Sequence, residues 1–387
     1  MLFSSLLDND LYKFTMMQFA FHHYPKKEAE YRLFFRNQNT QLNPNVLQKL
    51  PEEVAAISKL TLSPVELKYL ESLSTFSSKF LNYLETFSLK KEQVILQIHP
   101  RLEIRIKGPW PEVILWEVIL LALISELHFS HLQKEVWEEG KRKLQTKIDT
   151  FKKFSVPFPF MEFGTRRRIS KSWQRFVNTS LQKNLPSYFL GTSNVKLAMD
   201  LNLPCLGTMG HEFLQAGQSL SPNFANFQPY MLTKWIEEHP KLSIALTDVL
   251  SLSSFLHDFS MDLAKNYKGL RIDSGDPIES GEKILRFYQK NKINPKDKVI
   301  VFSDSLDFTK ASKIASHFQG KIPVQFGIGT YLTNDHGITP LNLVIKMVEF
   351  DHKPVGKLTD TPKKSVGFDP SILKRLETIE KTTHFWG

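Results

Sequence analysis

The sequence predicts an α/β fold in which parallel strands and helices alternate and close into an irregular (β/α) barrel. From about residue 152 onward, short apolar runs give way to helical patterns at spacings of roughly 15 to 40 residues. Each run ends in Gly, Ser, Thr or Asp, and seven such ends occur: 162–166, 191–194, 207–212, 247–248, 271–276, 303–307 and 327–330. Because the carboxyl ends of barrel strands meet at one mouth, we expect these segments to converge on one site. A doubly wound open sheet, which would spread them along an edge, is the alternative.

An α+β region is expected to flank the barrel in the sequence. Residues 31–35 have a strand pattern, and apolar and charged residues alternate over 102–107, which predicts a strand with one wet face. Residues 44–83 are expected to be helical with breaks at Pro51 and Pro64, and residues 8–13 to start a helix. Residues 341–350 predict a long strand that pairs with 355–358 and returns to the N-terminal region. We therefore assign residues 1–115 and 340–387 to an α+β domain and residues 116–339 to the barrel domain.

The net charge of +10 and the sequence pI near 9.3 indicate an anionic partner. The densest basic run, Arg166–Arg168, follows a predicted strand instead of lying in a tail, which favours anionic metabolites over nucleic acid. The most apolar long segment, residues 110–127, contains Pro111 and three glutamates and is expected to be a buried helix, not a membrane span.

Cysteine usage and the first residues bear on the compartment. Cys205 is the only cysteine, so an intramolecular disulfide and a cysteine metal cluster are excluded. The first ten residues lack a basic region, and Asp8 and Asp10 interrupt their apolar run, so no signal peptide is predicted. We expect a cytoplasmic protein.

The segment Gly207–Phe213 is the centre of the predicted site. A short apolar strand over 203–206 leads into small residues that allow a tight turn, and His211 follows with Glu212 beside it. A histidine at such a corner can contact an anion, act as a general base, or be a nucleophile that is itself modified. The alternative is a histidine that only bonds a loop carbonyl.

The other strand ends suit a phosphate-rich ligand. Asp273 and Asp276 lie on a tight turn near Arg271, where carboxylates could hold hydrated Mg²⁺, although a helix-capping turn is the simpler reading of that turn alone. Residues 303–305 suit ribose hydroxyls or a magnesium-bound diphosphate, and Gly327 and Gly329 could cradle a phosphate. No P-loop and no dinucleotide fingerprint is present in the sequence. Arginines 166–168, next to Phe163, offer a cation and an aromatic face to a flat acid, and one of the three is expected to touch ligand.

Taken in chain order, these segments resemble the nicotinate phosphoribosyltransferases of the type II phosphoribosyltransferase group. The resemblance is carried by residues 9–12, 162–167, 191–194, 207–212, 271–276, 327–330 and 353–358, nearly the whole chain. It implies an irregular barrel of the type II kind that forms nicotinate mononucleotide and diphosphate from nicotinate and phosphoribosyl diphosphate. ATP would be hydrolysed alongside to ADP and phosphate, and nicotinate would thereby enter NAD synthesis. The resemblance also implies Mg²⁺ and a cytoplasmic homodimer with a shared active site.

The resemblance assigns roles to residues. It implies that ATP phosphorylates His211 to a phosphohistidine, with Glu212 as a second catalytic residue. Tyr12, reaching from the partner subunit, and Phe163 would stack on the pyridine ring, while Arg166, Thr208 and Arg271 contact nicotinate. The phosphoribosyl diphosphate would contact Asp273, Ser274, Gly275, Asp304, Ser305, Gly327, Gly329, Thr330 and Arg36 of the neighbour, with Mg²⁺ near Asp273 and Asp304.

Ser193 is implied to set specificity. The related nicotinamide enzymes carry an acidic residue there, and a carboxylate would repel nicotinate whereas a serine would not. Two other functions remain open from sequence. A quinolinate transferase shares the barrel but needs no phosphorylated histidine, and a basic nucleic-acid-binding protein would show salt-dependent binding.

Overall fold

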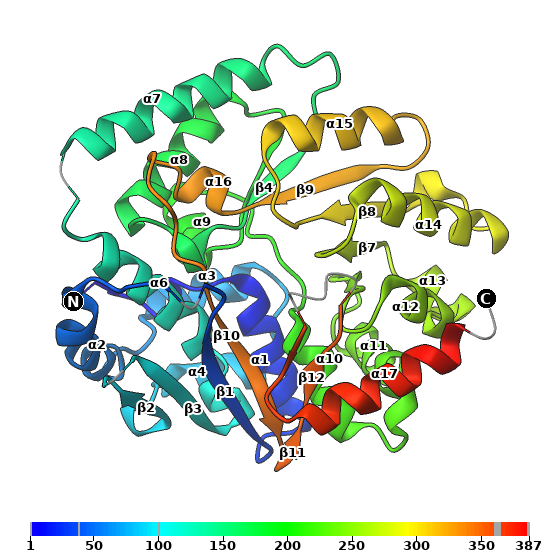
Figure 1. The fold of residues 1–387 in the computed structure, drawn as a ribbon, viewed down its shortest axis with the longest axis horizontal. Helices are drawn as coiled ribbons and strands as arrows, with labels where there is room; N and C mark the ends of the chain where they lie inside the picture. Colours follow the sequence, from blue (N-terminus) through cyan, green and yellow to red (C-terminus); the bar gives the residue numbers. More distant parts are fainter. Residues whose placement is uncertain (1, 38, 100, 133, 360–364, 385–387) are drawn as a thin grey trace.

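The computed structural model describes residues 2–37, 39–99, 101–132, 134–359 and 365–384, and it contains a five-stranded antiparallel sheet and a six-stranded parallel sheet (Figure 1). The expected α/β class and the barrel architecture with an N-terminal α+β region are confirmed. The assigned domain boundaries remain a prediction, and their ends at residue 1 and residues 385–387 lie outside the described residues.

The antiparallel sheet joins the two ends of the chain. Its order is β11 (Lys353–Pro354), β10 (Leu343–Phe350), β1 (Glu28–Phe35), β3 (Glu103–Pro109) and β2 (Val94–Gln97). β1 pairs with β10 from Ala29 opposite Phe350 to Phe35 opposite Leu343. Burial alternates along β3, as the apolar and charged alternation predicts. The long strand after Pro340 and its return to the N-terminal region are therefore confirmed.

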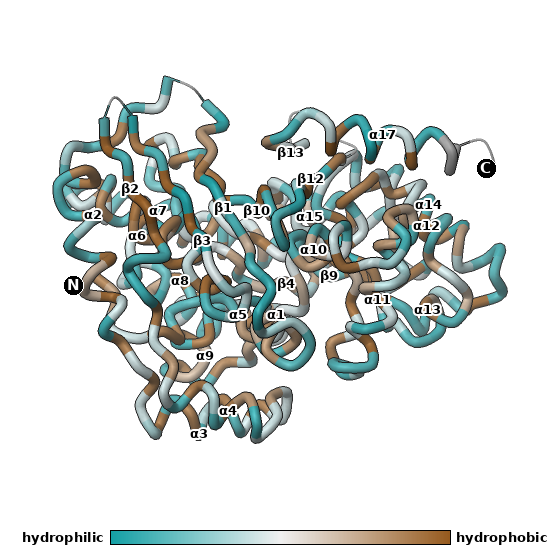
Figure 2. The backbone as a smooth tube through the Cα atoms, turned by 90° about the horizontal axis from the view of Figure 1, so that it is seen from below, coloured by the Kyte–Doolittle hydropathy of each residue, from teal (hydrophilic) through white to brown (hydrophobic). Residues whose placement is uncertain are grey.

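Helices cover this sheet and connect it to the barrel. Pro64 opens α3 as expected, and Ser63 and Glu66 form a capping box there. The break expected at Pro51 is wrong, because Pro51 lies exposed inside α2, which continues past it. Every residue of α6 except His128 is buried, in agreement with its apolar composition (Figure 2). The helices are α1 (Leu11–His23), α2 (Pro44–Ile57), α3 (Pro64–Ser72), α4 (Ser78–Glu85), α5 (Trp110–Val113), α6 (Trp116–Phe129) and α7 (Lys134–Phe151), with the 3₁₀ turn η1 (Lys91–Gln93).

Among the described residues no single helix is long and apolar enough to cross a membrane. One bent pair, Trp110–Phe129 with Lys134–Phe151, meets the length and composition requirement when its two parts are taken together.

The parallel sheet forms most of the barrel wall. Its order is β5 (Phe189–Thr192), β4 (Phe160–Glu162), β9 (Val324–Ile328), β8 (Val299–Phe302), β7 (Gly269–Ile272) and β6 (Ile244–Leu246), and all its pairs are parallel. The intervening helices and 3₁₀ turns are η2 (Thr165–Arg167), α8 (Lys171–Asn184), α9 (Val195–Leu201), α10 (His211–Leu220), η3 (Phe224–Asn226), α11 (Phe227–Glu238), α12 (Leu252–Asp258), α13 (Met261–Asn266), α14 (Pro277–Lys290), η4 (Pro295–Asp297), α15 (Phe308–Phe318) and α16 (Thr330–Thr333).

Residues 204–208 close the barrel between β5 and β6. The backbone N–H of Leu206 donates to Thr192 O at 2.9 Å, and Thr192 N–H donates to Pro204 O at 3.2 Å. On the other side, Thr208 Oγ1 donates to Ile244 O of β6 at 3.0 Å. The approach to β5 is close because Gly191 has φ +138° and a Cβ there would lie 2.2 Å from Pro204 O. The seventh wall segment is thus irregular, which explains why its hydrogen bonds yield one isolated bridge.

The C-terminal segment crosses from the antiparallel sheet to the barrel. Val355 N–H still donates to Val348 O of β10, but Leu358 N–H donates to Val249 O after β6. β12 (Gly356–Lys357) pairs with β13 (Val366–Gly367), so the expectation that 355–358 pairs wholly with the long strand is wrong. After β13, α17 (Pro370–His384) packs against α12 (Figure 2). This crossing delivers Lys357 to the mouth of the barrel.

Candidate active site

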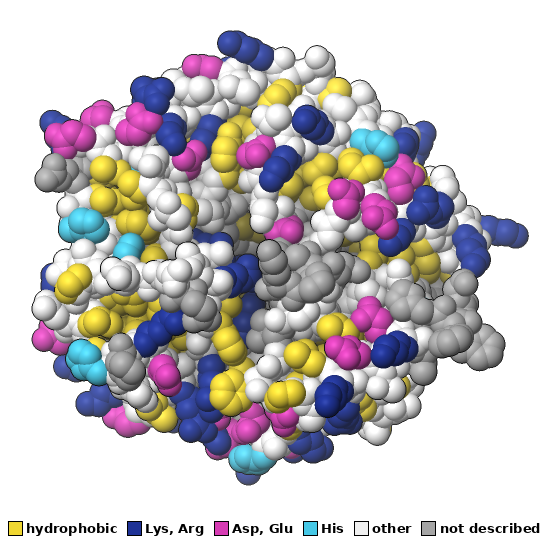
Figure 3. All heavy atoms as spheres, in the orientation of Figure 1, with side chains coloured by type: hydrophobic (Ala, Val, Ile, Leu, Met, Phe, Trp, Pro, Cys, Tyr) yellow, Lys and Arg dark blue, Asp and Glu magenta, His cyan; other side chains and the backbone are white. Residues whose placement is uncertain are grey.

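A cavity of about 560 Å³ lies between the barrel mouth and β10. Figure 3 shows dark blue lysine and arginine side chains inside a hollow in the middle of this face. Five of the seven strand ends, β10 and the first helix contribute to its wall, whereas residues 191–194 and 247–248 do not line it, so the expected convergence is observed in part. The predicted site residues that line it are Tyr12, Arg36, Phe163, Arg166, His211, Glu212, Arg271, Asp273, Asp304, Ser305, Gly327, Gly329 and Thr330.

His211 is the first residue of α10 and lies in the cavity wall with a side chain that is 9 % exposed. Its Nε2 lies 2.9 Å from Asp248 Oδ1 and 2.7 Å from Lys357 Nζ, and Lys357 Nζ also donates to Asp248 Oδ2 at 2.7 Å. Burial and the neighbouring Lys357 lower the pKa of His211 to about 4, against the opposing effect of Asp248. The imidazole is therefore neutral at pH 7. Nε2 cannot donate to Asp248 and accept from Lys357 at once. In the tautomer whose Nε2–H donates to Asp248, Lys357 donates to Asp248 alone and Nδ1 carries the lone pair that a nucleophile requires; in the other tautomer Nε2 accepts from Lys357 and Nδ1 carries the proton.

Asp248 and Lys357 fix this imidazole from two different elements. Burial alone would raise the pKa of Asp248, but Lys357 and His211 outweigh it and hold that pKa well below its usual range. The turn before α10 is built around the first helix, because a Cβ on Gly210 would lie 3.0 Å from the ring of Tyr12. The glycine-rich turn thus serves close packing of Tyr12 beside His211.

The donor atoms of His211, Asp248 and Asp273 lie within 4.8 Å of one another, as metal ligands would. Lys357 already places its ammonium against two of these three residues, so the cation of this cluster is a lysine. Asp273 also accepts from Ser303 Oγ at 2.8 Å and lies 3.6 Å from Arg271. Burial would raise the pKa of Asp273, but Arg271, His211 and Lys357 lower it, so it stays ionised. Asp273 and Asp304, both in the cavity wall, fit the oxygen-ligand chemistry of a hydrated Mg²⁺.

Aromatic and guanidinium groups also line the cavity. Tyr12, Phe163 and Arg166 all line it, and Arg166 NH1 lies 3.4 Å from Glu117 Oε1. A Cβ on Gly327 would lie 2.4 Å from the Phe163 ring, so this glycine gives the ring its space. Tyr12 and Arg36 line the cavity of the chain that carries them, and the expectation that they also reach the site of a partner subunit stays a prediction.

Two of the three consecutive arginines line the cavity, and the expectation that one of the three touches ligand stays a prediction. Arg166 and Arg167 line it, and Arg167 donates to Asn342 Oδ1 at 3.1 Å. Burial and the neighbouring Arg166 and Arg36 lower the pKa of Arg167 to about 10. The mutual repulsion of three guanidinium groups in one wall favours an anionic occupant.

Glu212 lines the cavity but is held by a buried lysine. Lys13 Nζ lies 2.6 Å from Glu212 Oε1 and 2.5 Å from Glu117 Oε2, and the Lys13 side chain is fully buried. Burial raises the pKa of Glu212 against the effect of Lys13. This arrangement ties α1 to α10 and α6, and the catalytic role expected for Glu212 stays a prediction.

Four predicted site residues do not line the cavity. Ser193 is buried and donates from Oγ to Asp10 Oδ1 at 2.8 Å, so its hydroxyl points at a carboxylate of this chain. The hydroxyl of Thr208 donates its hydrogen bond to Ile244 O of β6. Ser274 and Gly275 lie in the turn before α14, outside the lining.

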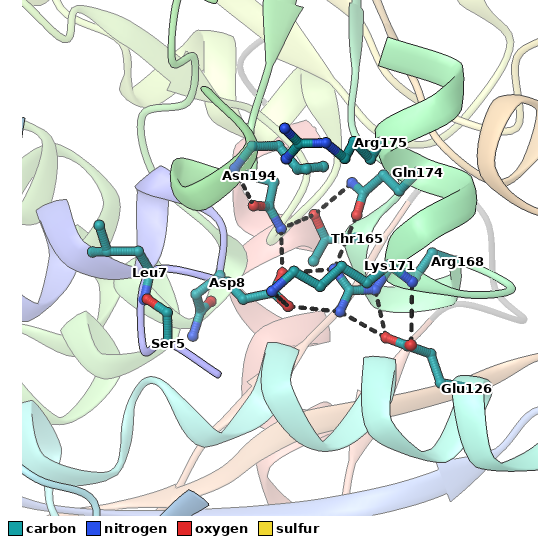
Figure 4. A network of polar contacts seen from close by, with 12 residues as sticks. Ser5, Leu7, Asp8, Glu126, Thr165, Arg168, Lys171, Gln174, Arg175 and Asn194 are labelled. Carbon is teal, nitrogen blue, oxygen red and sulfur yellow. Dashed lines mark hydrogen bonds and ion pairs between the residues drawn. The ribbon is translucent and has the colours of Figure 1, made fainter. Parts of the chain in front are cut away.

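Arg168, the third arginine, does not line the cavity and lies in a buried network of polar contacts (Figure 4). It is fully buried, with NH1 and NH2 at 2.6 and 2.8 Å from the two Asp8 oxygens and Nε at 2.8 Å from Glu126 Oε1. Asp8 also accepts from Asn194 Nδ2 at 2.8 Å. This network joins the segments that carry Tyr12, Arg166 and Ser193.

Sequence reasoning missed three residues that matter here. Asp248 follows β6 within a strand end that had been recognised, but nothing local shows its contact with His211. Lys357 belongs to the segment 353–358 of the resemblance, yet it was given no role. Lys346 is one of two charged residues in the otherwise apolar β10, the other being Glu349; such a position in a strand usually faces solvent, whereas Lys346 lines the cavity.

Comparisons with known proteins agree with this geometry. Residues 7–125 match the model of the nicotinate phosphoribosyltransferase (NAPRTase) N-terminal domain, and residues 158–383 match that of the nicotinate phosphoribosyltransferase (NAPRTase) family. The chain is similar to nicotinate phosphoribosyltransferases of Acinetobacter baumannii (42 % identity over 97 % of this chain and 96 % of the relative) and Bordetella petrii (40 %, 98 % of each). Among solved structures it is similar to those from Vibrio cholerae (TM-score 0.93, 34 % identity, 98 % of this chain and 94 % of that one) and Porphyromonas gingivalis (0.91, 30 %, 98 % and 100 %).

Proposed function

Because this chain belongs to the nicotinate phosphoribosyltransferase family, we propose that it transfers the phosphoribosyl group to nicotinate and couples the transfer to ATP through phosphorylation of His211. The products are nicotinate mononucleotide and diphosphate, with ADP and phosphate from the coupled ATP. The observation that carries the ATP step is the neutral imidazole of His211, fixed by Asp248 and Lys357 in the wall of the cavity.

For the transfer, the cavity must bind the pyridine ring, stabilise the leaving group and position the two reacting atoms. Tyr12 and Phe163 hold the flat pyridine ring, and Arg166 attracts its carboxylate. As the bond from the anomeric carbon to diphosphate breaks, negative charge grows on the leaving group, and the cations of the cavity stabilise it. Holding the ring nitrogen near the anomeric carbon lowers the entropic part of the activation free energy of the transfer.

The ATP step uses the groups around His211. The lone pair of the imidazole attacks the terminal phosphorus of ATP, the bond to ADP breaks, and Asp248 stabilises the positive charge that the phosphorylated ring acquires. Hydrolysis of that phosphohistidine later releases phosphate. Asp273 and Asp304 would hold Mg²⁺, which supplies charge neutralisation of diphosphate groups when bound.

The test measures both the label and the transfer. The parent chain and His211→Asn are incubated with [γ-³²P]ATP and Mg²⁺, quenched in alkali, and assayed separately for nicotinate mononucleotide. We expect alkali-stable, acid-labile label on the parent and none on the variant, together with loss of ATP stimulation. His317→Asn is the matched control, since His317 lies on the surface 2.7 Å from Glu282 and should label like the parent.

The outcomes separate the two parts of the proposal. A parent that forms the mononucleotide without carrying label would refute the phosphohistidine but not the transfer. A parent that forms no mononucleotide from nicotinate would refute the transfer itself, and turnover of quinolinate in its place would favour the alternative read from sequence.

A further inference from the structure

The last carbonyl groups of the short helix α16 are held by three different segments. A helix of four residues leaves these carbonyls without internal partners, so its shape depends on donors from elsewhere. α16 packs against α8 (Figure 1). The hydrogen bonds run from Lys147 Nζ to Tyr331 O, from Trp173 Nε1 to Leu332 O at 3.3 Å, and from Ile169 N–H to Thr333 O at 3.0 Å. Of the three residues whose carbonyls are held, only Tyr331 lines the cavity.

Lys147 reaches α16 from outside the cavity. It lies on α7 with a side chain that is 9 % exposed, and it does not line the cavity. Its Nζ donates to Tyr331 O and lies 4.0 Å from the centroid of the Tyr331 ring. One side chain on the far side of the cavity wall therefore holds both the backbone and the ring of Tyr331.

A carboxylate orients the Lys147 ammonium. Lys147 Nζ lies 2.8 Å from Asp335 Oδ2, and Lys143 Nζ, one turn earlier on α7, lies 2.9 Å from Asp335 Oδ1. Burial would raise the pKa of Asp335, but Lys147 and Lys143 outweigh it, so this carboxylate is ionised at pH 7. Burial lowers the pKa of Lys147, and Asp335 opposes that shift. A nearly buried lysine is unfavourable unless it is paired and hydrogen-bonded, and Asp335 and Tyr331 O meet both conditions.

The segment that Lys147 restrains is part of the cavity wall. Residues 329–331 line the cavity, and the first two of them are predicted to contact phosphoribosyl diphosphate. The next two residues of α16 keep their own donors without Lys147. Thr333 Oγ1 also donates to Gly164 O, in the turn after Phe163, at 3.1 Å. Loss of Lys147 therefore loosens the wall at 329–331 more than it loosens the turn beside Phe163.

We propose that Lys147 is a positioning residue for phosphoribosyl diphosphate: by holding Tyr331 from outside the cavity, it keeps residues 329–331 in the conformation that contacts this ligand. The assignment rests on the proposed function. Lys147 does not touch the ligand, so its removal acts through the placement of the wall, and a displacement of about 1 Å is enough to weaken a positioned contact. Its removal is therefore expected to affect one substrate and not the other two.

The experiment measures the KM of each substrate in turn. Formation of nicotinate mononucleotide is followed for the parent, Lys147→Met and Lys147→Arg while one of phosphoribosyl diphosphate, nicotinate and ATP is varied and the other two are saturating. We expect Lys147→Met to raise the KM for phosphoribosyl diphosphate about tenfold and to change the other two KM values and kcat by less than about threefold. Lys147→Arg should recover most of the loss, because it keeps a charged donor for Tyr331 O and Asp335. A merely structural role would not separate the three KM values.

A control, a second variant and a second measurement complete the test. Lys141→Met is the matched control, because Lys141 on the same helix is 43 % exposed and pairs with Glu138 at 2.9 Å, and it should leave all three KM values unchanged. Asp335→Asn answers the question if Lys147→Met folds poorly. Asp335 is 33 % exposed, and its replacement removes the carboxylate that orients Lys147, so the KM for phosphoribosyl diphosphate should rise about threefold. Hydrogen exchange of the ligand-free full chain, followed by mass spectrometry, should be faster over residues 329–334 in both variants than in the parent.

The refuting results are distinct from a failure of the proposed function. An unchanged KM for phosphoribosyl diphosphate in Lys147→Met, or in Asp335→Asn if the first variant does not fold, overturns the assignment of Lys147. An equal rise in all three KM values, or unchanged hydrogen exchange over residues 329–334, overturns it as well. Each of these results is obtained against a parent chain that forms nicotinate mononucleotide, whereas a parent without that activity overturns the proposed function on which the assignment depends.

Discussion

Replacing Arg168 by Met should destabilise the chain more than any surface change. The guanidinium contacts Asp8, Glu126 and Gln174 in a fully buried setting, and the Met variant leaves two carboxylates buried without it. Breaking a buried charge network by removing one partner costs about 3 to 5 kcal/mol. We therefore expect Arg168→Met to lower the free energy of unfolding at pH 7 by about that amount.

The pKa of Asp8 gives an independent estimate. Burial would raise that pKa, but Arg168, Lys171 and Asn194 outweigh it and lower it from 3.8 to about 2. Since a tenfold ratio corresponds to about 1.4 kcal/mol, this difference is worth about 2 kcal/mol of stability for Asp8 alone. Because the folded pKa is depressed, this contribution is complete above pH 4 and is lost as the pH falls toward 2. The difference in the free energy of unfolding between the parent and Arg168→Met should therefore become smaller as the pH falls from about 4 to about 2.

Urea unfolding followed by circular dichroism measures the effect. Arg175→Met is the matched control, because Arg175 on α8 is 48 % exposed and pairs with Asp200 at 3.1 Å, and it should cost no more than about 1 kcal/mol. The double variant Asp8→Asn with Arg168→Met should recover part of the loss, since one uncompensated carboxylate is gone. Equal losses for Arg168→Met and Arg175→Met would refute the reasoning.

Two further changes test the nicotinate end of the cavity. Gly327→Ala should raise the KM for nicotinate by about tenfold and leave the KM for ATP within about twofold of the parent value. The reason is that the new methyl group would lie 2.4 Å from the Phe163 ring and must displace it. Equal KM values for nicotinate in variant and parent would contradict this. Ser193→Asp should weaken the use of nicotinate relative to nicotinamide, which the two KM values would show. It should also lower the free energy of unfolding by about 2 kcal/mol, measured by thermal unfolding, because it places a second carboxylate against Asp10. A folded Ser193→Asp protein with unchanged preference would remove Ser193 from the account of specificity.

The fold could be read from sequence wherever a local pattern determines it. Alternation identified β3, and the apolar runs with polar ends identified the barrel and the meeting of its strand ends. What failed depended on contacts between distant segments. The pairing of β12 with β13 and its crossing toward Val249 leave no local signal, and Pro51 is tolerated inside α2 because its helix face is exposed.

The candidate site divides in the same way. His211, Asp273 and Phe163 were predicted because each follows a strand in a recognisable turn, and all three line the cavity. The hydrogen-bond partner of Ser193 could not be predicted, since Asp10 lies 183 residues earlier in the sequence. Lys346 was missed because a charged residue within an apolar strand usually faces solvent, and nothing local distinguishes one that faces a cavity.

The pairing of β1 with β10 bears on how the enzyme forms during synthesis. Ala29 is synthesised long before its strand partner Phe350. Until β10 arrives, β1 is bordered by β3 on one side and carries an open edge on the other, where foreign strands can add. The cavity meanwhile lacks the wall that bears Lys346. A chain that stops before residue 343 therefore lacks the β10 wall of the cavity and leaves one edge of β1 uncovered. We expect such a truncated chain to aggregate and not to yield a partly active fragment.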